Sequence, residues 1–516
     1  MFKDFRRFSL SAILAVHRVL GTLLSVVFLM WFLTGFVMMY HRFPRVYDSD
    51  RVEHLEPLGN GGGEELPSIE ELSARIDGKA MRSLRMERYL EQTYFRVQTS
   101  DSVYMLPAQQ QEVLHSMAEG QSYLDGVVST WCQAPIAKVD TLWKLDQWIP
   151  FGSMKADLPV YRYYFDDAEQ HQLYQSSQTG QVIQFTTRSE RIWAWLGAIP
   201  HWIYFYQLRQ NVEQWSNVVI ALSGAGCIMV LGGLWMGIVR WRQQRRKHHK
   251  GISPYKKRWY RWHHVAGLVF GIFVLAFVFS GMMSMMDIPA WISHSHLQGS
   301  PTRFMRAKAP QPTAYTLDYR QVVETYPAAI QLEWSNFREH SYYVVTTADD
   351  TYYIDAAGMQ PRPLSLSRDE MVGAVEAFYR TDSATSALQI SLTVELLDHF
   401  ETHYRARSVI ATEKLLPVWK VTADDADHSV FYLNPQNAAV RYVDTTSRLY
   451  YWAYTALHRM RIGYLNANTT LRKTVLWILL IGGTVVSASG IVLGVNWLRR
   501  SVRRKPQKKE ELNENK

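Results

Sequence analysis

Histidine is the residue type in this chain whose placement most strongly indicates chemistry. Of the 17 histidines, four fall into two sets related by constant shifts: His17 and His263 are 246 positions apart, and His201 and His458 are 257 positions apart. Neutral imidazole is the commonest protein ligand for a metal and binds through either ring nitrogen. These two sets therefore predict metal coordination, provided that the surrounding elements bring the members of each set together.

Four uncharged segments of the chain are long enough to cross a lipid bilayer, for which roughly 20 apolar residues are needed. They are Val19–Tyr40, Trp215–Val239, Val265–Met286 and Thr474–Leu498. The first has an apolar core too long for a cleaved signal peptide, and it lacks a small-residue cleavage site. We therefore expect an α-helical membrane bundle of four transmembrane helices, the first acting as a signal anchor.

The positive charge of the chain is concentrated beside these segments. Residues 1–11, 240–261 and 499–516 hold 21 of the 56 lysines and arginines but only 4 of the 47 acidic residues. Short basic segments beside spans stay in the cytosol and lie against anionic membrane lipid. The net charge of +9 therefore indicates topology, with both termini cytosolic, and does not indicate a nucleic-acid partner.

This topology divides the chain into successive parts. They are a cytosolic N-terminus (1–11), a first span (12–41), a first extracytoplasmic domain (42–192), an outer segment rich in aromatic residues and histidine (193–214), a second span (215–239), a basic cytosolic loop (240–261), a third span (262–288), a second extracytoplasmic domain (289–447), a second outer aromatic and histidine segment (448–472), a fourth span (473–498) and a cytosolic tail (499–516). We expect the charged tail from Arg503 to be disordered and Gly59–Gly63 to be a flexible linker.

The two halves of the chain are similar to each other. A shift of 246 residues aligns the first span with the third, and a shift of 257 residues aligns the second span with the fourth. The aligned pairs include His17 with His263, Gly21 with Gly267, Thr34-Gly35 with Ser280-Gly281, Trp195 with Trp452, His201 with His458, Gly226 with Gly483, Gly233 with Gly490 and Gly237 with Gly494. Since both halves begin on the same side of the membrane, the internal duplication is parallel. Equivalent residues can then face one another across an axis along the membrane normal.

Both extracytoplasmic domains are expected to have an α+β fold. Helical periodicity occurs over Arg368–Tyr379, and alternating patterns typical of strands occur in both halves. The expected strands are Thr93–Val97 with Val103–Leu106, Pro159–Phe165 with Gln172–Phe185, Tyr342–Thr346 with Thr351–Asp355, and Leu416–Ala423 with Val430–Val443. The two cysteines, Cys132 and Cys227, are too few for an iron–sulfur cluster.

Several motifs resemble those of the PepSY-associated transmembrane helix family. His-Arg-Val-Leu-Gly opens the first span, Trp-His-His-Val-Ala-Gly opens the third, and Leu-Pro-Val-Tyr and Leu-Pro-Val-Trp begin equivalent strands in the two halves. The resemblance covers nearly the whole chain and implies two PepSY-like periplasmic domains on a bundle in the bacterial inner membrane. The best-understood members resemble a di-haem ferric-siderophore reductase, which implies two haem b groups with paired histidine ligands.

The matched histidines fit that expectation. His17 and His263 lie at the cytosolic ends of their spans, and His201 and His458 lie just before the other two spans on the outer side. Each set would hold one haem iron. Helical geometry places Gly21 and Gly35 on the same helix face as His17, with Gly35 about 27 Å along the axis. Gly267 and Gly281 repeat this arrangement beside His263, and these four glycines are expected to pack against the haems.

Other histidines are reserve candidates. His264, next to His263, is an alternative ligand, although the repeat selects His263. His41, at the outer end of the first span, is an alternative for the outer haem or an interface anchor. Three further groups are more simply read as polar surface or loop: His399-x-x-x-His403, which has helical metal-ligand spacing, His294-Ser295-His296, and His248-His249 in the basic loop.

Two functions from different classes follow. The first is a haem-containing reductase that moves electrons across the membrane to a ferric siderophore or other ferric chelate in the periplasm, supplied by an unidentified donor that is either a quinol or a cytosolic reductase. The second is a membrane-anchored PepSY binding or regulatory protein, for example one that restrains a peptidase. No nucleotide-binding or HExxH motif is present, no catalytic residue is assigned, and transport is disfavoured because no span has a midplane charge or a proline break.

Overall fold

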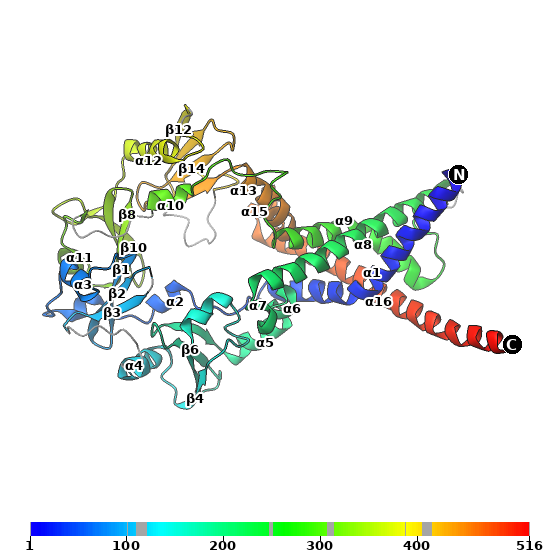
Figure 1. The fold of residues 1–516 in the computed structure, drawn as a ribbon, viewed down its shortest axis with the longest axis horizontal. Helices are drawn as coiled ribbons and strands as arrows, with labels where there is room; N and C mark the ends of the chain where they lie inside the picture. The colour runs from blue at the N-terminus through cyan, green and yellow to red at the C-terminus, as the bar shows by residue number, and fades with distance from the viewer. Residues whose placement is uncertain are drawn as a thin grey trace.

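The computed structural model describes residues 2–514 of the 516-residue chain, except for 101, 110–120, 247–250, 307–313, 387–388 and 405–414. The chain forms a bundle of long helices, and β-sheets with short helices are gathered at one end of it (Figure 1). Both ends of the chain lie at the opposite end of the bundle (Figure 1). We call these two ends the sheet end and the terminus end.

Four membrane spans were expected from the sequence. Within the described residues, four helices are long and apolar enough to cross a membrane, which confirms this number. They are α1 (Phe2–Met38), α8 (Val212–Arg246), α9 (Arg258–Met283) and α16 (Thr469–Glu514). Helix α1 packs against α8 and α16, and α9 packs against the same two helices. Helices α1 and α9 therefore occupy opposite corners of the bundle.

The tail of the chain differs from expectation. We predicted disorder from Arg503, but α16 continues without a break to Glu514. The tail is composed mostly of lysine, arginine, glutamine and glutamate, which all have high intrinsic helix propensity. Because the helix is already nucleated in the span, adding residues of this kind to its end is favourable.

The strands form three antiparallel sheets. One has seven strands in the order β11-β10-β9-β8-β1-β2-β3, and the others have the orders β4-β5-β6-β7 and β12-β13-β14-β15. Their bounds are β1 (Ser83–Tyr89), β2 (Gln92–Gln98), β3 (Val103–Pro107), β4 (Ile136–Leu142), β5 (Val160–Phe165), β6 (Gln172–Ser176), β7 (Val182–Thr186), β8 (Ala329–Phe337), β9 (His340–Thr347), β10 (Thr351–Asp355), β11 (Arg362–Pro363), β12 (Leu392–Leu397), β13 (Val418–Ala423), β14 (Val430–Leu433) and β15 (Val440–Val443). All the strand pairs expected from the sequence are present.

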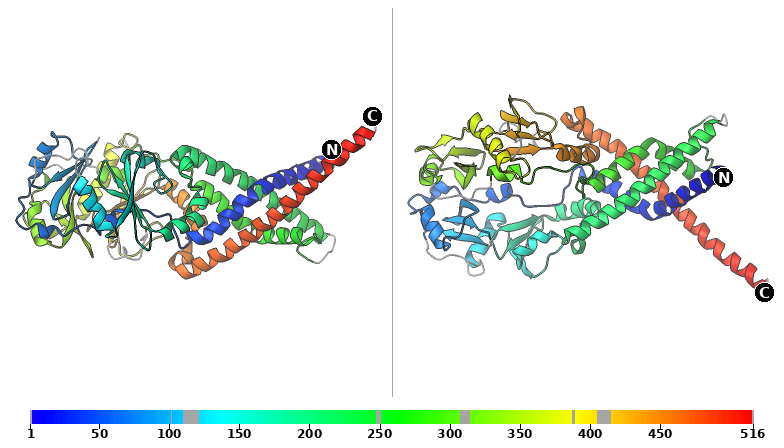
Figure 2. Two further views of the ribbon diagram at one scale, coloured as in Figure 1. Left: turned by 90° about the horizontal axis from the view of Figure 1, so that it is seen from below. Right: turned by 45° about the horizontal axis from the view of Figure 1, so that its top comes forward.

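The seven-stranded sheet joins the two halves of the chain. Strand β1 of the first half pairs with β8 of the second, so that Leu84 lies opposite Trp334. Both side chains are buried in one core with Leu72 of α3 (Ile69–Arg75) and Val322 of α11 (Tyr319–Thr325). The two four-stranded sheets lie nearer the bundle, one in each half, as Figures 1 and 2 show. The apolar faces of both halves thus share a core that neither half would complete alone.

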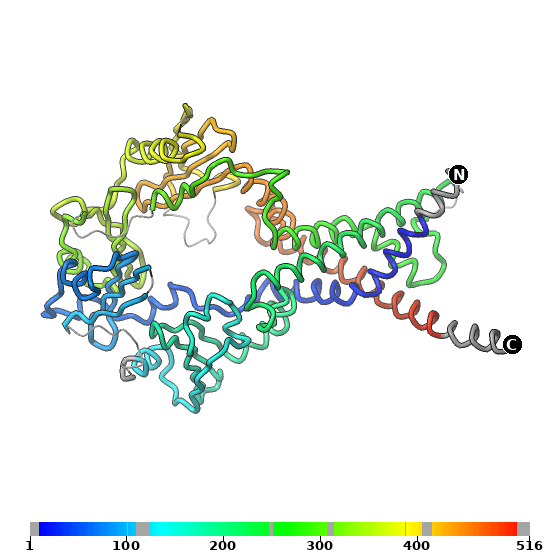
Figure 3. Tube along the Cα trace, in the orientation of Figure 1, coloured from blue at the N-terminus to red at the C-terminus, as the bar shows by residue number. Residues whose placement is uncertain are grey.

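Short helices complete the sheet end. In the first half they include α2 (Asp48–Val52), α4 (Gln121–Trp131), α5 (Arg188–Leu196), α6 (Ala198–Trp202) and α7 (Tyr206–Arg209); in the second they include α10 (Pro301–Arg306), α12 (Arg368–Thr381), α13 (Thr445–Tyr450), a π-helical turn (Tyr451–Ala456), α14 (Leu457–Arg459) and α15 (Gly463–Ala467). Helix α12 confirms the helix expected over Arg368–Tyr379. Figure 3 traces the chain as it leaves α1, builds the sheets of the first half and returns into α8.

The glycine-rich segment after the first span is not a free linker. Part of it forms a 3₁₀ turn, Leu58–Gly61, and the Gly59 amide donates a hydrogen bond of 3.0 Å to the carbonyl oxygen of Pro327. A Cβ atom at Gly59 would stand 2.6 Å from that oxygen. Glycine is required here because the backbones of the two halves approach closely, and the prediction of flexibility was wrong.

Candidate functional site

The four histidines selected from the sequence form two pairs, one toward each end of the bundle. His17 on α1 and His263 on α9 have ring centres 6.2 Å apart. His201 on α6 and His458 on α14 have ring centres 6.3 Å apart. Helix α6 packs against α1, and α14 packs against α9. Since α1 and α9 are diagonal corners, each pair brings two imidazoles together across the middle of the bundle.

In the terminus-end pair, His17 and His263, each ring is fixed by a backbone carbonyl. His17 Nδ1 donates to the carbonyl oxygen of Met229 at 2.8 Å, and His263 Nδ1 donates to that of Val486 at 3.2 Å. A carbonyl oxygen only accepts hydrogen bonds, so Nδ1 carries the hydrogen in both rings. The lone pair then lies on Nε2, which is the arrangement found in histidines that bind metals.

In the sheet-end pair, His201 and His458, hydroxyl groups accept the hydrogen bond from Nδ1. His201 Nδ1 lies 3.0 Å from Thr34 Oγ1, whose own hydrogen is donated to a carbonyl one turn earlier on α1. Thr34 must therefore accept from the ring. His458 Nδ1 lies 3.1 Å from Ser280 Oγ and 3.3 Å from a backbone carbonyl of α9. These contacts again leave the Nε2 lone pair available in both rings.

The same hydrogen bonds occur in both halves at the shifts found in the sequence. Thr34 and Ser280 are separated by 246 residues, and Met229 and Val486 by 257 residues. The ends of the short histidine helices also match. Ile203 and Met460, each two residues after a paired histidine, are left-handed, with φ of 54° and 49°. A left-handed residue ends an α-helix, so each sheet-end histidine occupies the last turn of its helix.

Glycine makes the carbonyl contacts of the terminus-end pair accessible. Gly233 and Gly490 follow the accepting carbonyls by one helical turn, and a side chain there would cover the carbonyl oxygen. A Cβ atom at Gly233 would stand 2.5 Å from His17 Cε1 and 2.9 Å from His17 Nδ1. At Gly490 the corresponding distance to His263 Cε1 is 3.6 Å. There is therefore no space for a Cβ atom at Gly233, whereas a Cβ atom at Gly490 would fit at an ordinary contact distance.

The four glycines expected beside a cofactor lie along α1 and α9 at the levels of the two pairs. A Cβ at Gly35 would stand 3.0 Å from Leu480 Cδ2 and 4.0 Å from His201 Cε1, and one at Gly281 would stand 3.7 Å from His458 Cε1. Near the terminus-end pair, a Cβ at Gly21 would meet only the Met229 sulfur, at 3.7 Å, among the described residues. At Gly267 it would meet no described atom within 4 Å.

The spacing of the rings fits two imidazoles on one metal. A metal–nitrogen bond of about 2.0 Å on each side, with about 1.1 Å from nitrogen to ring centre, places the ring centres about 6 Å apart. Across the described residues, no cluster of three or more His, Cys, Asp or Glu side chains is arranged to hold a metal ion. A pair of opposed imidazoles suits a metal whose remaining positions are filled by a macrocycle, which is the case for haem. The donor set and the glycine-lined helix faces therefore fit haem.

An apolar core separates the two pairs. Phe28, Phe32 and Phe277 are buried between the helices, and the rings of Phe32 and Phe277 are 6.3 Å apart in edge-to-face contact. Gly226 and Gly483 admit two of these rings, since Cβ atoms there would stand 2.6 Å from Phe28 and 2.3 Å from Phe32. This packing excludes water from the interior between the two ends of the bundle.

The sheet-end imidazoles are neutral at ordinary pH. Removal from water lowers the pKa of His201 to about 4. The same effect, together with the neighbouring His201, lowers the pKa of His458 to about 3. Burial disfavours the charged form of histidine. Both rings therefore keep a free lone pair at neutral pH.

Arginines gather beside His458 at the sheet end. Burial and the nearby positive charges of Arg472, Arg459 and Arg42 lower the pKa of Arg461. Like charges so close to one another create a positive potential. This surface would attract an anion to the end of the bundle that carries the His201 and His458 pair.

The two reserve histidines lie outside the pairs. His264 Nε2 donates to the carbonyl oxygen of Gly237 at 3.1 Å, so this ring is turned toward α8. His41 is stacked on Trp193, with ring centres 4.1 Å apart and planes 1° from parallel. Neither ring is in ring-to-ring contact with another histidine among the described residues.

The two other histidine groups within the described residues are not arranged as metal sites. His399 pairs with Asp398 at 2.9 Å, and His403 packs on Tyr451. The helical spacing proposed for them is not realised, because the segment after β12 is not helical. In the His294-Ser295-His296 group, the His294 ring packs on that of His296, whose Nδ1 contacts an aspartate at 2.7 Å. The His248-His249 group lies outside the described residues.

Sequence reasoning missed the groups that fix the rings of the terminus-end pair. The carbonyls of Met229 and Val486 carry no signal in their side chains, and Gly233 and Gly490 resembled ordinary helix-packing glycines. Ser489 Oγ, 3.0 Å from His263 Nδ1, was also missed, because the first half has glycine at the equivalent position. The recurrence of glycine one turn after each carbonyl was the available signal.

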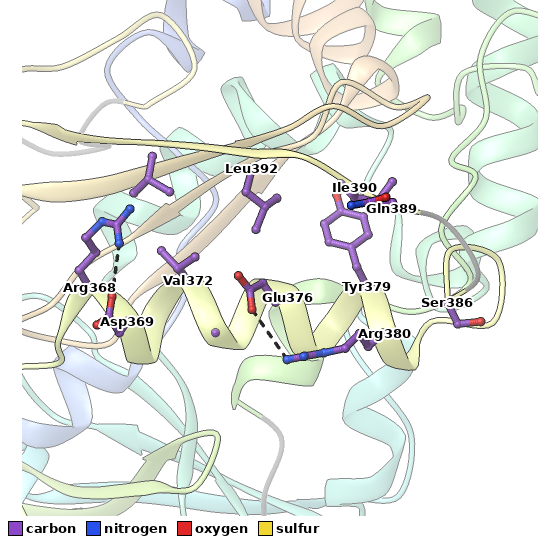
Figure 4. Close-up of a pocket in the computed structure, with 12 residues that line it drawn as sticks. Arg368, Asp369, Val372, Glu376, Tyr379, Arg380, Ser386, Gln389, Ile390 and Leu392 are labelled. Atoms are coloured by element: carbon purple, nitrogen blue, oxygen red, sulfur yellow. Dashed lines mark hydrogen bonds and ion pairs between the residues drawn. The ribbon is translucent and has the colours of Figure 1, made fainter.

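A separate groove lies in the sheet region of the second half. It has a volume of about 830 Å³ and lies between α12 and β12, with apolar and charged lining (Figure 4). Val372 and Leu392 contribute apolar surface, and Glu376 forms an ion pair with Arg380 at 3.8 Å. The paired histidines are not among the residues that line it.

Comparison of the chain with models of known protein families gives no match, and comparison with curated proteins gives no relative. The resemblance to the PepSY-associated family therefore stays a hypothesis that depends on the motifs.

Proposed function

We propose that this chain is a haem-containing membrane reductase that passes electrons from one face of the membrane to the other, where a ferric chelate is reduced. The observation that carries the proposal is the set of two opposed imidazole pairs, each with Nδ1 tied to an acceptor. One pair stands toward each end of a bundle of membrane-spanning length. A single pair would support haem binding, but two pairs at different depths support transfer across the membrane.

The matched contacts support an internal parallel duplication with PepSY-like domains at the sheet end. On this proposal the sheet end is periplasmic and the terminus end is cytosolic, in the inner membrane of a bacterium. The basic segments at 1–11, 240–261 and 499–516 belong to the terminus end, in agreement with the positive-inside tendency.

On this proposal, different residues of the chain would bind the haems, orient the ligands and exclude water. His17 with His263 and His201 with His458 would each hold one haem b, which supplies one-electron transfer when bound. The Nδ1 acceptors fix ring orientation and raise the basicity of Nε2. Phe28, Phe32 and Phe277 keep water out of the space between the pairs, which limits the solvent reorganisation that accompanies charge movement.

The arginines beside His458 support an anionic chelate as the electron acceptor. The positive charges of Arg461, Arg472 and Arg459 would attract a negatively charged ferric complex, such as a ferric siderophore, toward the sheet end of the bundle. Ferrous iron binds hard oxygen donors less tightly than ferric iron, so one-electron reduction releases the metal. The acceptor therefore needs only a brief encounter with this surface.

The direct experiment is spectroscopic. Purified protein is expected to be red, to contain two haem b per chain by the pyridine haemochrome assay, and to shift its Soret band on reduction with dithionite. Anaerobic addition of an anionic ferric chelate should then return the oxidised spectrum. Colourless protein from haem-replete cells would exclude a haem-containing reductase. Red protein that no ferric chelate re-oxidises would exclude ferric chelates as the substrate.

The hydroxyl that fixes His201 offers a finer test. In Thr34→Val the shape is kept, but His201 Nδ1 loses its hydroxyl acceptor and keeps only the backbone carbonyl of Trp31, so the ring would become a weaker donor to iron. The midpoint potential of one haem is expected to rise on the order of tens of millivolts, with both haems retained. The control is Thr22→Val on the same helix, whose hydroxyl bonds only to the backbone at 2.8 Å. Equal potentials in Thr34→Val and wild type would show that Thr34 does not tune a ligand.

The groove at α12 supports a second candidate, a ligand-binding or regulatory module. Its volume of about 830 Å³ is within the range of small-molecule sites. If purified protein is colourless but a ligand protects the second half from proteolysis, this function replaces the reductase.

A further inference from the structure

His264 is a buried histidine that the proposed electron path does not use. Its side chain is 8% exposed, and its Nε2–H donates to Gly237. Its Nδ1 has no hydrogen-bond partner among the residues that the structure describes. At the aligned position the first half has Arg18, which is exposed. His264 is therefore an unpaired acceptor in one half only, next in sequence to a member of the terminus-end pair.

A second unpaired acceptor lies on the neighbouring helix. Gln244 of α8 is 9% exposed, and its amide nitrogen donates to the carbonyl oxygen of Gly251 at 3.4 Å. Its Oε1 finds no donor within the described part of the chain. An unsatisfied buried polar atom costs about 1–3 kcal/mol, so two such atoms near one end of the bundle indicate a ligand.

Both residues are held at α8: Gln244 belongs to this helix, and His264 of α9 donates from Nε2 to its Gly237 carbonyl. Gly237, which holds the His264 ring, and Gln244 are seven residues apart, so they face nearly the same way and are separated by about 10 Å along the axis. A 1,4-hydroquinone carries its two hydroxyl groups at opposite ends of the ring, so one molecule can donate hydrogen bonds to two separated acceptors. Tyr255, whose ring lies edge-on to His264 at 5.4 Å between ring centres, offers an aromatic contact for such a head group.

We propose that His264 and Gln244 bind the head group of a lipid-soluble hydroquinone at the terminus end of the bundle. This inference rests on the proposed function, for which it names the electron donor. A membrane donor is favoured over a cytosolic protein because His264 lies within the candidate span Arg258–Met283, two residues from the exposed Trp262. Both acceptors take hydrogen bonds, which matches a hydroquinone with its two O–H groups.

The overall reaction balances. One hydroquinone gives up two electrons and two protons and becomes a quinone. The electrons would leave one at a time through a haem held by the terminus-end pair, and would reduce two ferric chelates to the ferrous state at the sheet end. The two protons are released to water at the terminus end.

Binding can be measured without turnover. The probe is 2-heptyl-4-hydroxyquinoline N-oxide, a hydroquinone analogue whose fluorescence is quenched when it binds. We expect one site per wild-type chain, with affinity lowered about tenfold or more in both His264→Leu and Gln244→Leu. The matched control, Arg18→Gln, alters the aligned position of the other half and should bind as wild type. The two leucine variants act on different helices, and haem content checks that each is folded.

The outcomes separate this inference from the proposed function. Failure of the wild-type protein to quench the probe, or equal binding by both leucine variants and wild type, would overturn the quinol site. If such a protein still contains two haems and is re-oxidised by ferric chelates, the reductase stands and its donor lies elsewhere. Absence of haem would remove the reductase whatever the probe shows. Reduction of wild type by duroquinol, slowed in His264→Leu at unchanged haem content, would support both.

Discussion

Replacing His458 with alanine is expected to reduce the haem content from two per chain to one. His458 and His201 stand with ring centres 6.3 Å apart, and on the proposed function each would supply one of the two nitrogens that hold the sheet-end haem. Without one imidazole the proposed haem site would lose half of its protein ligands. The pyridine haemochrome assay measures the loss. Electron paramagnetic resonance of the ferric protein should show one low-spin signal where wild type shows two.

The haem at the terminus end should survive this change. His17 and Thr34 are seventeen residues apart on α1, so the two pairs are separated by about 25 Å along the helix. His17→Ala should show the complementary pattern, in which the other low-spin signal disappears. The control is His41→Ala, because His41 stacks on Trp193 and lies outside both pairs. Two haems with unchanged spectra in His458→Ala would refute the assignment of this ligand.

Replacing Gly233 with alanine is expected to disrupt the terminus-end haem through a single methyl group. The new Cβ would stand 2.5 Å from His17 Cε1 and 2.9 Å from Nδ1, within the contact distance of both atoms. The ring must rotate, which breaks its 2.8 Å hydrogen bond to Met229 and changes the direction of its Nε2 lone pair. Overpacking of this kind costs about 1–3 kcal/mol, and disturbed outer contacts lower metal affinity about 10–100-fold. Haem titration of the apoprotein would measure the change.

The second half supplies the matched control for this prediction. Gly490 occupies the aligned position beside His263, but its Cβ would stand 3.6 Å from Cε1, an ordinary van der Waals distance. Gly490→Ala should therefore retain both haems with near wild-type affinity. Alanine also raises helix propensity equally at both positions, so that effect cancels in the comparison. Equal loss in the two variants would show that helix packing, and not ring placement, decides the result.

Much of the fold could be predicted from local sequence patterns. The four spans follow from the uninterrupted length of the apolar segments, because placing a charged side chain in lipid is energetically unfavourable. The helix α12 and the strand pairs of β2 with β3 and β9 with β10 follow from periodicity, because each is decided by neighbours close in the chain. The pairing of β1 with β8 was not predictable in this way. It joins segments some 245 residues apart, and the pattern of a strand does not name its partner.

Local propensity also misled in two places. The run Gly59–Gly63 has the composition of a flexible linker, but close approach of the Pro327 carbonyl makes glycine necessary there for steric reasons. The charged tail after Arg503 has the composition of a disordered segment, but it inherits a nucleated helix from the span. In both cases the neighbour that decided the outcome lies outside the window from which composition is read.

The sequence alone determined which histidines to pair, because the same shifts that align spans and glycines also align His17 with His263 and His201 with His458. Only the tertiary structure decided that the ring centres of each pair are separated by the distance expected for two imidazoles on one metal. That distance depends on the diagonal placement of α1 and α9. It also decided the tautomers, because Met229 and Val486 act through backbone carbonyls that every residue possesses. A side-chain pattern can name candidate ligands, but the groups that orient them become visible only when the helices are packed.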